Sequence, residues 1–142
     1  MQKNELLQWN NTIIRILAID DARVLVIDCV KRTMPQWINS DALSECKSCE
    51  KSKLELQTEI ELDDFENMNI QERRIAHERY TMIAGVLPFV ADESWRSMII
   101  DKIADEKKVS KQTVRRYLCL YLAFDDMSVL YRLLLKKCQC KR

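Results

Sequence analysis

The chain has 142 residues, of which 47% are hydrophobic and 32% are charged, and its net charge is +1. These values are typical of a soluble globular protein with one ordinary domain or two very small ones, and they exclude an intrinsically disordered chain. We expect neither a membrane span nor a secretory signal, because no apolar run reaches about 18 residues and the N-terminus lacks an apolar segment. The expected location is therefore the cytoplasm.

The charge is distributed unevenly along the sequence. Residues 107–142 contain ten Lys or Arg and two Asp, a net charge of +8, which leaves about −7 for residues 1–106. A basic C-terminal third on an otherwise acidic chain indicates a polyanion as the partner of that third. The alternative is a solvated, lysine-rich tail.

A β-hairpin is predicted near the N-terminus, although a single Gly and two Pro favour a largely helical chain. Residues 12–19 and 23–30 are rich in β-branched side chains and are separated by a short polar turn. Their imperfect alternation indicates that both faces of the hairpin are partly covered. Residues 6–9 are a candidate for a preceding short strand, and Trp37 and Ile38 are expected to pack back onto the sheet.

Residues 41–62 complete the predicted N-terminal module. Asp41 is expected to cap a weak helix that runs to about residue 51. Residues 53–62 alternate strictly and predict a half-buried strand that closes a small sheet with the hairpin. We therefore expect a small α+β module over residues 1–62, followed by an acidic linker at residues 63–69.

From residue 70 the hydrophobic period becomes helical, and residues 70–142 are predicted to form a helical domain. A first helix is expected to end at Pro88, and a second to start at Asp92 or Ser94. After a break at residues 123–126, residues 129–135 predict a further short helix, and residues 138–142 are expected to fray. The apolar stripe of the first helix consists of Ile75, Ala76, Tyr80, Ile83 and Leu87.

Residues 95–122 have the pattern of a helix-turn-helix, a motif whose second helix enters the major groove of DNA. The polar turn at residues 107–109 is followed by Ser110, which is placed to cap the second helix. Val109 is expected to fill the angle between the helices. The apolar stripes are Ile99, Ile100, Ile103 and Ala104 on the first helix and Val114, Leu118 and Tyr121 on the second.

The opposite face of the second helix carries the candidate DNA contacts. A spacing of about 100° per residue places Gln112 and Arg116 opposite the apolar stripe. Gln suits adenine and Arg suits guanine, so these two residues, with Thr113, are the candidates for base contacts. The candidates for phosphate contacts, which flank the turn, are Lys108, Lys111 and Arg115. The alternative is a solvated helix face without a ligand.

The six cysteines are interpreted as reduced thiols rather than disulfides. Cys46 and Cys49 have the spacing of a zinc knuckle, and Cys138 and Cys140 form a second close pair. A four-cysteine zinc site would require these pairs to meet, although Cys138 follows Cys49 by 89 positions. Unmetallated thiols are therefore favoured over zinc, and we expect no cofactor.

Catalysis by this chain is not expected. His77 is the only histidine and has no partner nucleophile in its neighbourhood of Arg and Glu. The acidic residues come mainly as adjacent pairs in turns, which seldom converge on one metal ion. Gly85 alone cannot form a glycine-rich phosphate loop. We therefore expect a binding protein and not an enzyme.

Two segments together resemble the N-terminal part of the TnsB-type transposases, relatives of the phage Mu and retroviral integrase group. Residues 11–21, with their Arg-Ile-Leu-Ala-Ile core, and residues 23–29 resemble the opening β-hairpin of that family. The order and separation of the segments also match, and the resemblance covers about four fifths of the chain. The residues that resemble the first helix-turn-helix of the family are Ile103, Ala104, Val109, Ser110, Thr113, Val114, Arg116 and Tyr121.

The resemblance implies a DNA-binding front end that recognises transposon-end repeats. In the family, a second binding domain and a magnesium-dependent catalytic domain with three carboxylates follow. This chain departs from the pattern at Asp125 and Asp126, which replace the glycine usual after the second helix, and it ends before a catalytic fold begins. The expected partners are double-stranded DNA at transposon ends, other transposition proteins and a second copy of the chain. The alternatives are a free-standing helix-turn-helix transcriptional regulator and a protein-interaction adaptor that does not bind DNA.

Overall fold

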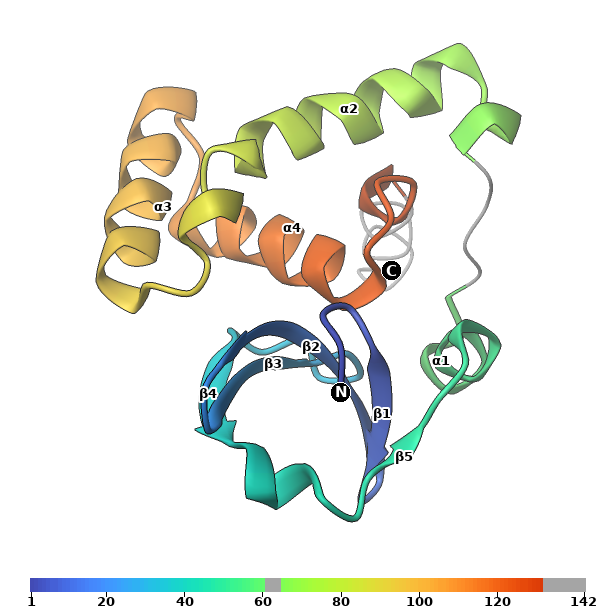
Figure 1. Ribbon diagram of the computed structural model, residues 1–142. Helices are drawn as coiled ribbons and strands as arrows, with labels where there is room; N and C mark the ends of the chain where they lie inside the picture. The colour runs from blue at the N-terminus through green and yellow to red at the C-terminus, as the bar shows by residue number, and fades with distance from the viewer. Residues whose placement is uncertain (61–64, 132–142) are drawn as a thin grey trace. The chain divides into compact units, whose positions relative to one another are not determined.

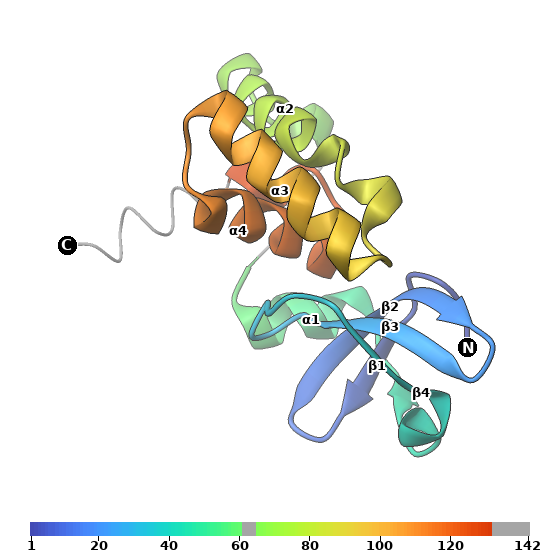
Figure 2. The same ribbon diagram turned by 90° about the vertical axis from the view of Figure 1, so that its left-hand side faces the viewer.

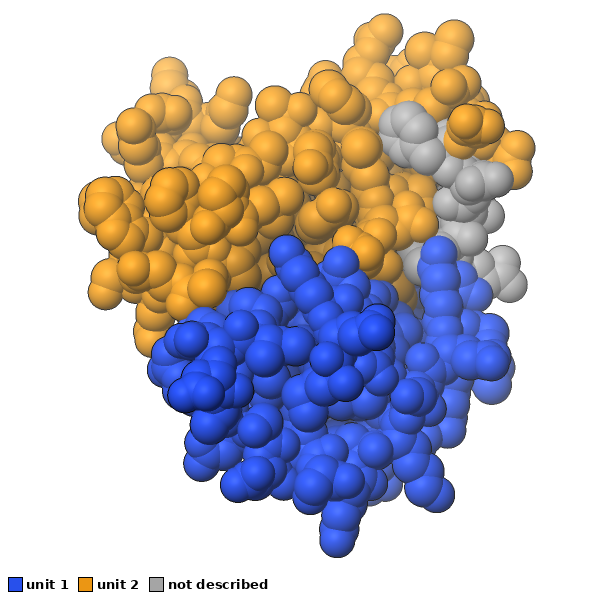
Figure 3. Space-filling view, in the orientation of Figure 1, with its two compact units in different colours: residues 1–61 blue, residues 62–142 orange. Residues whose placement is uncertain are grey.

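An antiparallel sheet is followed by a helical region, so the predicted α+β class is confirmed (Figure 1). The structure is a computed structural model and describes residues 1–60 and 65–131. The chain divides into two compact units, residues 1–61 and residues 62–142 (Figure 3). Among the described residues, no helix has the length and the apolar character that crossing a membrane would require.

The first unit is built on a five-stranded antiparallel sheet in the order β4-β3-β2-β1-β5 (Figure 1). The predicted hairpin and the short strand before it are both confirmed, and residues 36–39, which include Trp37 and Ile38, add a fourth strand. β2 opposes β3 with Ile16 facing Val26, and the register shifts at a bulge between Ile16 and Ala18. The strands are β1 (Leu6–Trp9), β2 (Thr12–Asp20), β3 (Arg23–Asp28), β4 (Gln36–Asn39) and β5 (Lys47–Ser48).

The hairpin turns are made without glycine. Asn10 lies between β1 and β2 with φ 57°, and Asp21 lies between β2 and β3 with φ 55°. Asn and Asp enter this left-handed region more readily than other residues with a Cβ atom. The low glycine content was therefore a poor argument against tight hairpins in this chain.

Both faces of the sheet are covered, as its imperfect alternation predicted. Residues 13–17 of β2 are buried without interruption, which requires packing on both sides. On one face, Leu43 from the 3-10 turn η1 (Ser40–Leu43) packs into the core. This core cluster comprises Leu7, Ile14, Ile16, Val24, Val26 and Leu43, with Trp9, Ile38 and Cys46 packed against it.

Two predictions for the end of this unit were wrong. Residues 41–51 do not form a helix, because η1 ends at Leu43 and β5 follows it. Residues 51–58, predicted in part as a strand, form the helix α1 (Lys51–Thr58). The alternation was misleading, because Leu54 is fully buried but Leu56 is 80% exposed. The polar residues that alternate with them, Lys53, Glu55 and Gln57, are good helix formers.

The second unit contains three long helices: α2 (Ile70–Ala84), α3 (Glu93–Lys107) and α4 (Lys111–Phe124). α3 and α4 pack against each other, and α2 packs against both (Figure 2). A 3-10 turn, η2 (Phe65–Asn67), lies within the segment predicted as a linker. α2 begins with a capping box in which the Asn69 side chain accepts from the Glu72 N–H at 2.8 Å.

The predicted stripes of this unit are largely confirmed, and two boundaries are shifted. α2 ends at Ala84, earlier than predicted, because the chain tightens into the 3-10 turn η3 (Leu87–Phe89) around Pro88. α4 continues into the first half of the predicted break, since Ala123 and Phe124 are buried in the core, and ends at Phe124, with Asp125 as its C-cap at φ 52°. The described part of the next predicted helix, residues 129–131, is helical, and the rest lies outside the described residues.

Candidate nucleic-acid interface

α3, the turn at residues 108–110 and α4 form a helix-turn-helix (Figure 2). Helix-turn-helix turns of this length often contain Gly. Here Lys108 adopts the left-handed conformation, with φ 57° and ψ 43°. The Val109 N–H returns to the Ala104 carbonyl oxygen at 3.0 Å, and the Val109 side chain is half-buried between the helices' ends. The turn is therefore fixed by backbone hydrogen bonds without glycine.

Ser110 caps α4 as predicted. Its Oγ accepts the Thr113 N–H at 3.1 Å, and the two hydroxyl oxygens lie 3.0 Å apart. The Thr113 hydroxyl thus takes part in the cap interaction and is only partly exposed. Of the three residues predicted for base contacts, Thr113 is the one that already has a structural partner.

The other two candidates project from the exposed side of α4. Val114 and Leu118 are fully buried, whereas Gln112 is exposed and Arg116 is partly exposed. Within the described part of the chain, the side chains of Gln112 and Arg116 make no hydrogen bond or ion pair. Amide and guanidinium groups that lack a protein partner are able to donate to base edges.

The exposed face of α4 is short. By helical spacing, Cys119 and Ala123 continue the face that begins with Gln112 and Arg116. Both are buried, with exposures of 3% and 0%. On this face only the first two turns of α4 are therefore available to a ligand, which is the part that helix-turn-helix proteins use for base contacts.

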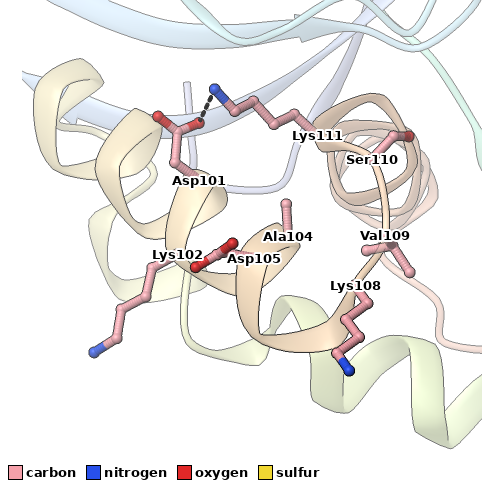
Figure 4. Close-up of a pocket in the computed structure, with 8 residues that line it drawn as sticks. All are labelled: Asp101, Lys102, Ala104, Asp105, Lys108, Val109, Ser110 and Lys111. Carbon is pink, nitrogen blue, oxygen red and sulfur yellow. Dashed lines mark ion pairs between the residues drawn. The ribbon is translucent and has the colours of Figure 1, made fainter.

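The candidate phosphate contacts do not all point the same way. Arg115 is partly exposed, and Lys108 extends away from Lys111 (Figure 4). The Lys111 ammonium group instead lies 3.4 Å from the Asp101 carboxylate of α3. These lysines line an open hollow between α3 and the start of α4, whose other lining residues are Asp101, Lys102, Ala104, Asp105, Val109 and Ser110 (Figure 4).

Asp101 is the residue of this site that sequence reasoning missed. It lies one helical turn before Asp105, and both line the hollow beside α4. Their spacing of four residues, just before a cationic turn, is a signal that places two carboxylates on one side of α3. The spacing does not show which lysine meets them, because that depends on the angle between the two helices.

α2 also packs against α4. The Tyr80 ring meets the Tyr121 ring edge-on, with centroids 5.2 Å apart. Burial raises the pKa of the Tyr121 hydroxyl, and its neighbours Tyr80 and Asp125 add to the effect. The contact fixes the C-terminal half of α4 and does not cover the face that carries Gln112 and Arg116.

The cysteine pairs give no support to a zinc site in the described residues. Cys46 packs against the core cluster, and the Cys49 N–H donates to the Leu6 carbonyl oxygen at 2.9 Å. Burial raises the pKa of both thiols. In the part of the chain that is described, no three His, Cys, Asp or Glu side chains cluster so as to hold a metal ion, and Cys138 and Cys140 lie outside it.

No protein-family model matches this sequence, and no curated protein matches it either. The function is therefore inferred from the geometry of α3, the turn and α4.

Proposed function

We propose that this chain binds double-stranded DNA in a sequence-specific manner, with the first two turns of α4 in the major groove. The observation that carries the proposal is the pair Gln112 and Arg116, which share an exposed face of a capped helix and have no protein partner among the described residues. Arg donates bidentately to guanine and Gln pairs bidentately with adenine. Lys108, Lys111 and Arg115 supply attraction to phosphates that does not depend on sequence.

The narrower proposal is that the bound DNA is a transposon end. It is supported by the resemblance to the N-terminal part of TnsB-type transposases, which joins a β-hairpin to a helix-turn-helix in the same order. Under this proposal the chain recognises the end repeats and contributes no catalytic residue of a DDE transposase. Other transposition proteins, or further copies of the chain on the DNA, are then its partners.

The test starts with selection of bound duplexes from a random pool, because the target sequence is unknown. Gel shifts across a salt series then compare the selected duplex with a scrambled one. We expect Arg116→Ala or Gln112→Ala to weaken binding of the selected duplex by roughly 5- to 150-fold and to leave the scrambled duplex almost unaffected. Lys111→Ala should weaken both duplexes alike and lower the salt slope by about 1.

Arg74→Ala is the matched control, because Arg74 is an exposed cation on α2 that lies outside the helix-turn-helix. It should change neither the affinity nor the preferred sequence. If no sequence is enriched, or if Arg116→Ala and Gln112→Ala bind as the unaltered protein does, recognition by α4 is wrong. A palindrome bound by a stable dimer would instead favour a free-standing regulator.

A protein-interaction module is the second candidate, and one observation favours it. Phe89 and Trp95 stack with ring centroids 5.8 Å apart, and both are exposed, as is Met98 one helical turn further along α3. Exposed apolar side chains that cluster in this way are typical of protein contacts. Indifference of the chain to DNA at low salt, where phosphate attraction is strongest, would make this the preferred function.

A further inference from the structure

α4 begins with a positively charged residue, which is unfavourable at the N-terminus of a helix. Lys111 is its first residue, and its first turn contains no acidic residue. The N-terminus of a helix carries partial positive charge, so a lysine there is unfavourable and an anion is favoured. The start of α4 therefore attracts negative charge that α4 itself does not provide.

The missing negative charge comes from α3. Asp101 Oδ1 lies 3.4 Å from Lys111 Nζ, and Figure 4 shows the two side chains pointing toward each other. The side chains are 48% and 55% exposed, so the pair is well solvated. An ion pair of this kind shifts an equilibrium by up to about fivefold, which makes it easy to break.

We infer that Asp101 is a positioning residue that competes with DNA phosphates for Lys111. In the free protein its carboxylate holds the ammonium group, and a phosphate has to displace that carboxylate before Lys111 can contact the backbone. The contact is independent of sequence, so Asp101 weakens attraction to any duplex, whereas Gln112 and Arg116 read the bases. This inference rests on the proposed DNA binding and concerns the same face of the protein.

Asp105 provides a matched control for the charge itself. It lies one turn after Asp101 on α3, lines the same hollow and makes no ion pair with any described residue. Asp105→Asn and Asp101→Asn therefore remove the same charge from the same side of α3. Only the second removes the partner of Lys111.

The experiment measures the affinity of five proteins for the selected and the scrambled duplex at low salt. They are the unaltered chain, Asp101→Asn, Asp105→Asn, Lys111→Ala and the double variant Asp101→Asn with Lys111→Ala. We expect Asp101→Asn to tighten binding of both duplexes by about three- to fivefold, and Asp105→Asn by less than about twofold. In the Lys111→Ala background, Asp101→Asn should have less than about a twofold effect.

The salt series adds a second measurement. Screening should bring the affinities of Asp101→Asn and the unaltered chain together between about 50 mM and about 500 mM salt. An equal gain from Asp105→Asn would overturn the inference in favour of general repulsion, and so would a full Asp101→Asn effect without Lys111. If the unaltered chain binds DNA and Asp101→Asn changes nothing, only this inference fails. If no protein binds any duplex, the proposed function fails and the inference fails with it.

Discussion

Arg79 of α2 donates from Nη1 to the backbone carbonyl oxygen of Leu130 at 2.7 Å. The same guanidinium lies 5.2 Å from the centroid of the Tyr117 ring of α4. One side chain thus joins α2, α4 and the segment that follows α4. The orientation of the candidate recognition helix therefore depends on a residue that lies outside the helix-turn-helix.

Replacement of this residue should destabilise the second unit. Arg79→Ala removes a charge-assisted hydrogen bond and a cation–π contact, which together contribute about 2–3 kcal/mol. Urea unfolding should show this loss, with faster amide exchange in α2 and α4. Arg74→Ala, on the same helix but exposed, should change the free energy of unfolding by less than about 0.5 kcal/mol. An equal loss from both variants would show that the contacts of Arg79 do not matter.

Replacing Lys108 in the turn by glycine should raise stability and lower the affinity for DNA. Lys108 is held at φ 57°, a conformation that costs a residue with a Cβ atom about 1 kcal/mol. Lys108→Gly should raise the free energy of unfolding by about 0.5–1 kcal/mol and weaken all duplexes alike, because a candidate phosphate contact is lost.

Asp125→Gly is the control, because Asp125 ends α4 at φ 52° and is not a candidate DNA contact. It should raise stability slightly and leave DNA binding unchanged. Lower stability of Lys108→Gly would mean that the lysine side chain supports the turn.

The first unit should lose stability in alkali because of Cys29. Burial raises the pKa of this thiol from 9.0 to about 12 and outweighs the nearby Arg15, which favours the thiolate. Between these values the folded chain holds a proton that the unfolded chain has lost, so stability falls as the pH rises. The loss accumulates to about 4 kcal/mol by pH 12 and is absent below about pH 9.

Urea unfolding in a Trp95→Phe background measures this dependence, because the fluorescence then comes from Trp9 and Trp37, the tryptophans of the first unit. Cys29→Ala provides the comparison, because it removes the buried thiol and keeps the lysines, which also titrate in alkali. All four tyrosines lie in the second unit and are retained in both proteins, so their titration affects the two profiles alike. Parallel pH profiles of the two proteins would contradict the prediction.

Burial should also divide the thiols by reactivity. Cys29 and Cys119 are buried, with exposures of 0% and 3%, whereas Cys46 and Cys49 are partly exposed. Brief alkylation of the native chain, followed by peptide mass mapping, should modify Cys46 and Cys49 first. In denaturant the four residues should be modified to a similar extent. Early modification of Cys29 would show that the first unit opens readily.

Where local chemistry decides the structure, the sequence was enough to predict it. The β-branched runs on either side of Asp21 predicted the hairpin. Ser110 and the apolar stripes predicted the two helices of the helix-turn-helix. α1 was mistaken for a strand because Leu54 and Leu56 alternate, and only the tertiary structure shows that one is buried and the other exposed. The Lys111–Asp101 pair could not be predicted, because helical spacing gives faces of one helix and not the contacts between two.

If α4 binds DNA as proposed, its short exposed face limits the number of base pairs that one copy of the chain can contact. Residues 111–116 rise about 9 Å along the helix axis, which matches about three base pairs of a duplex. A recognition sequence of three base pairs occurs by chance about every 64 positions, so it cannot specify a unique site in a genome. Selective binding would then require a longer recognised sequence. Several copies of the chain on spaced repeats, or a second DNA-binding surface, would provide it.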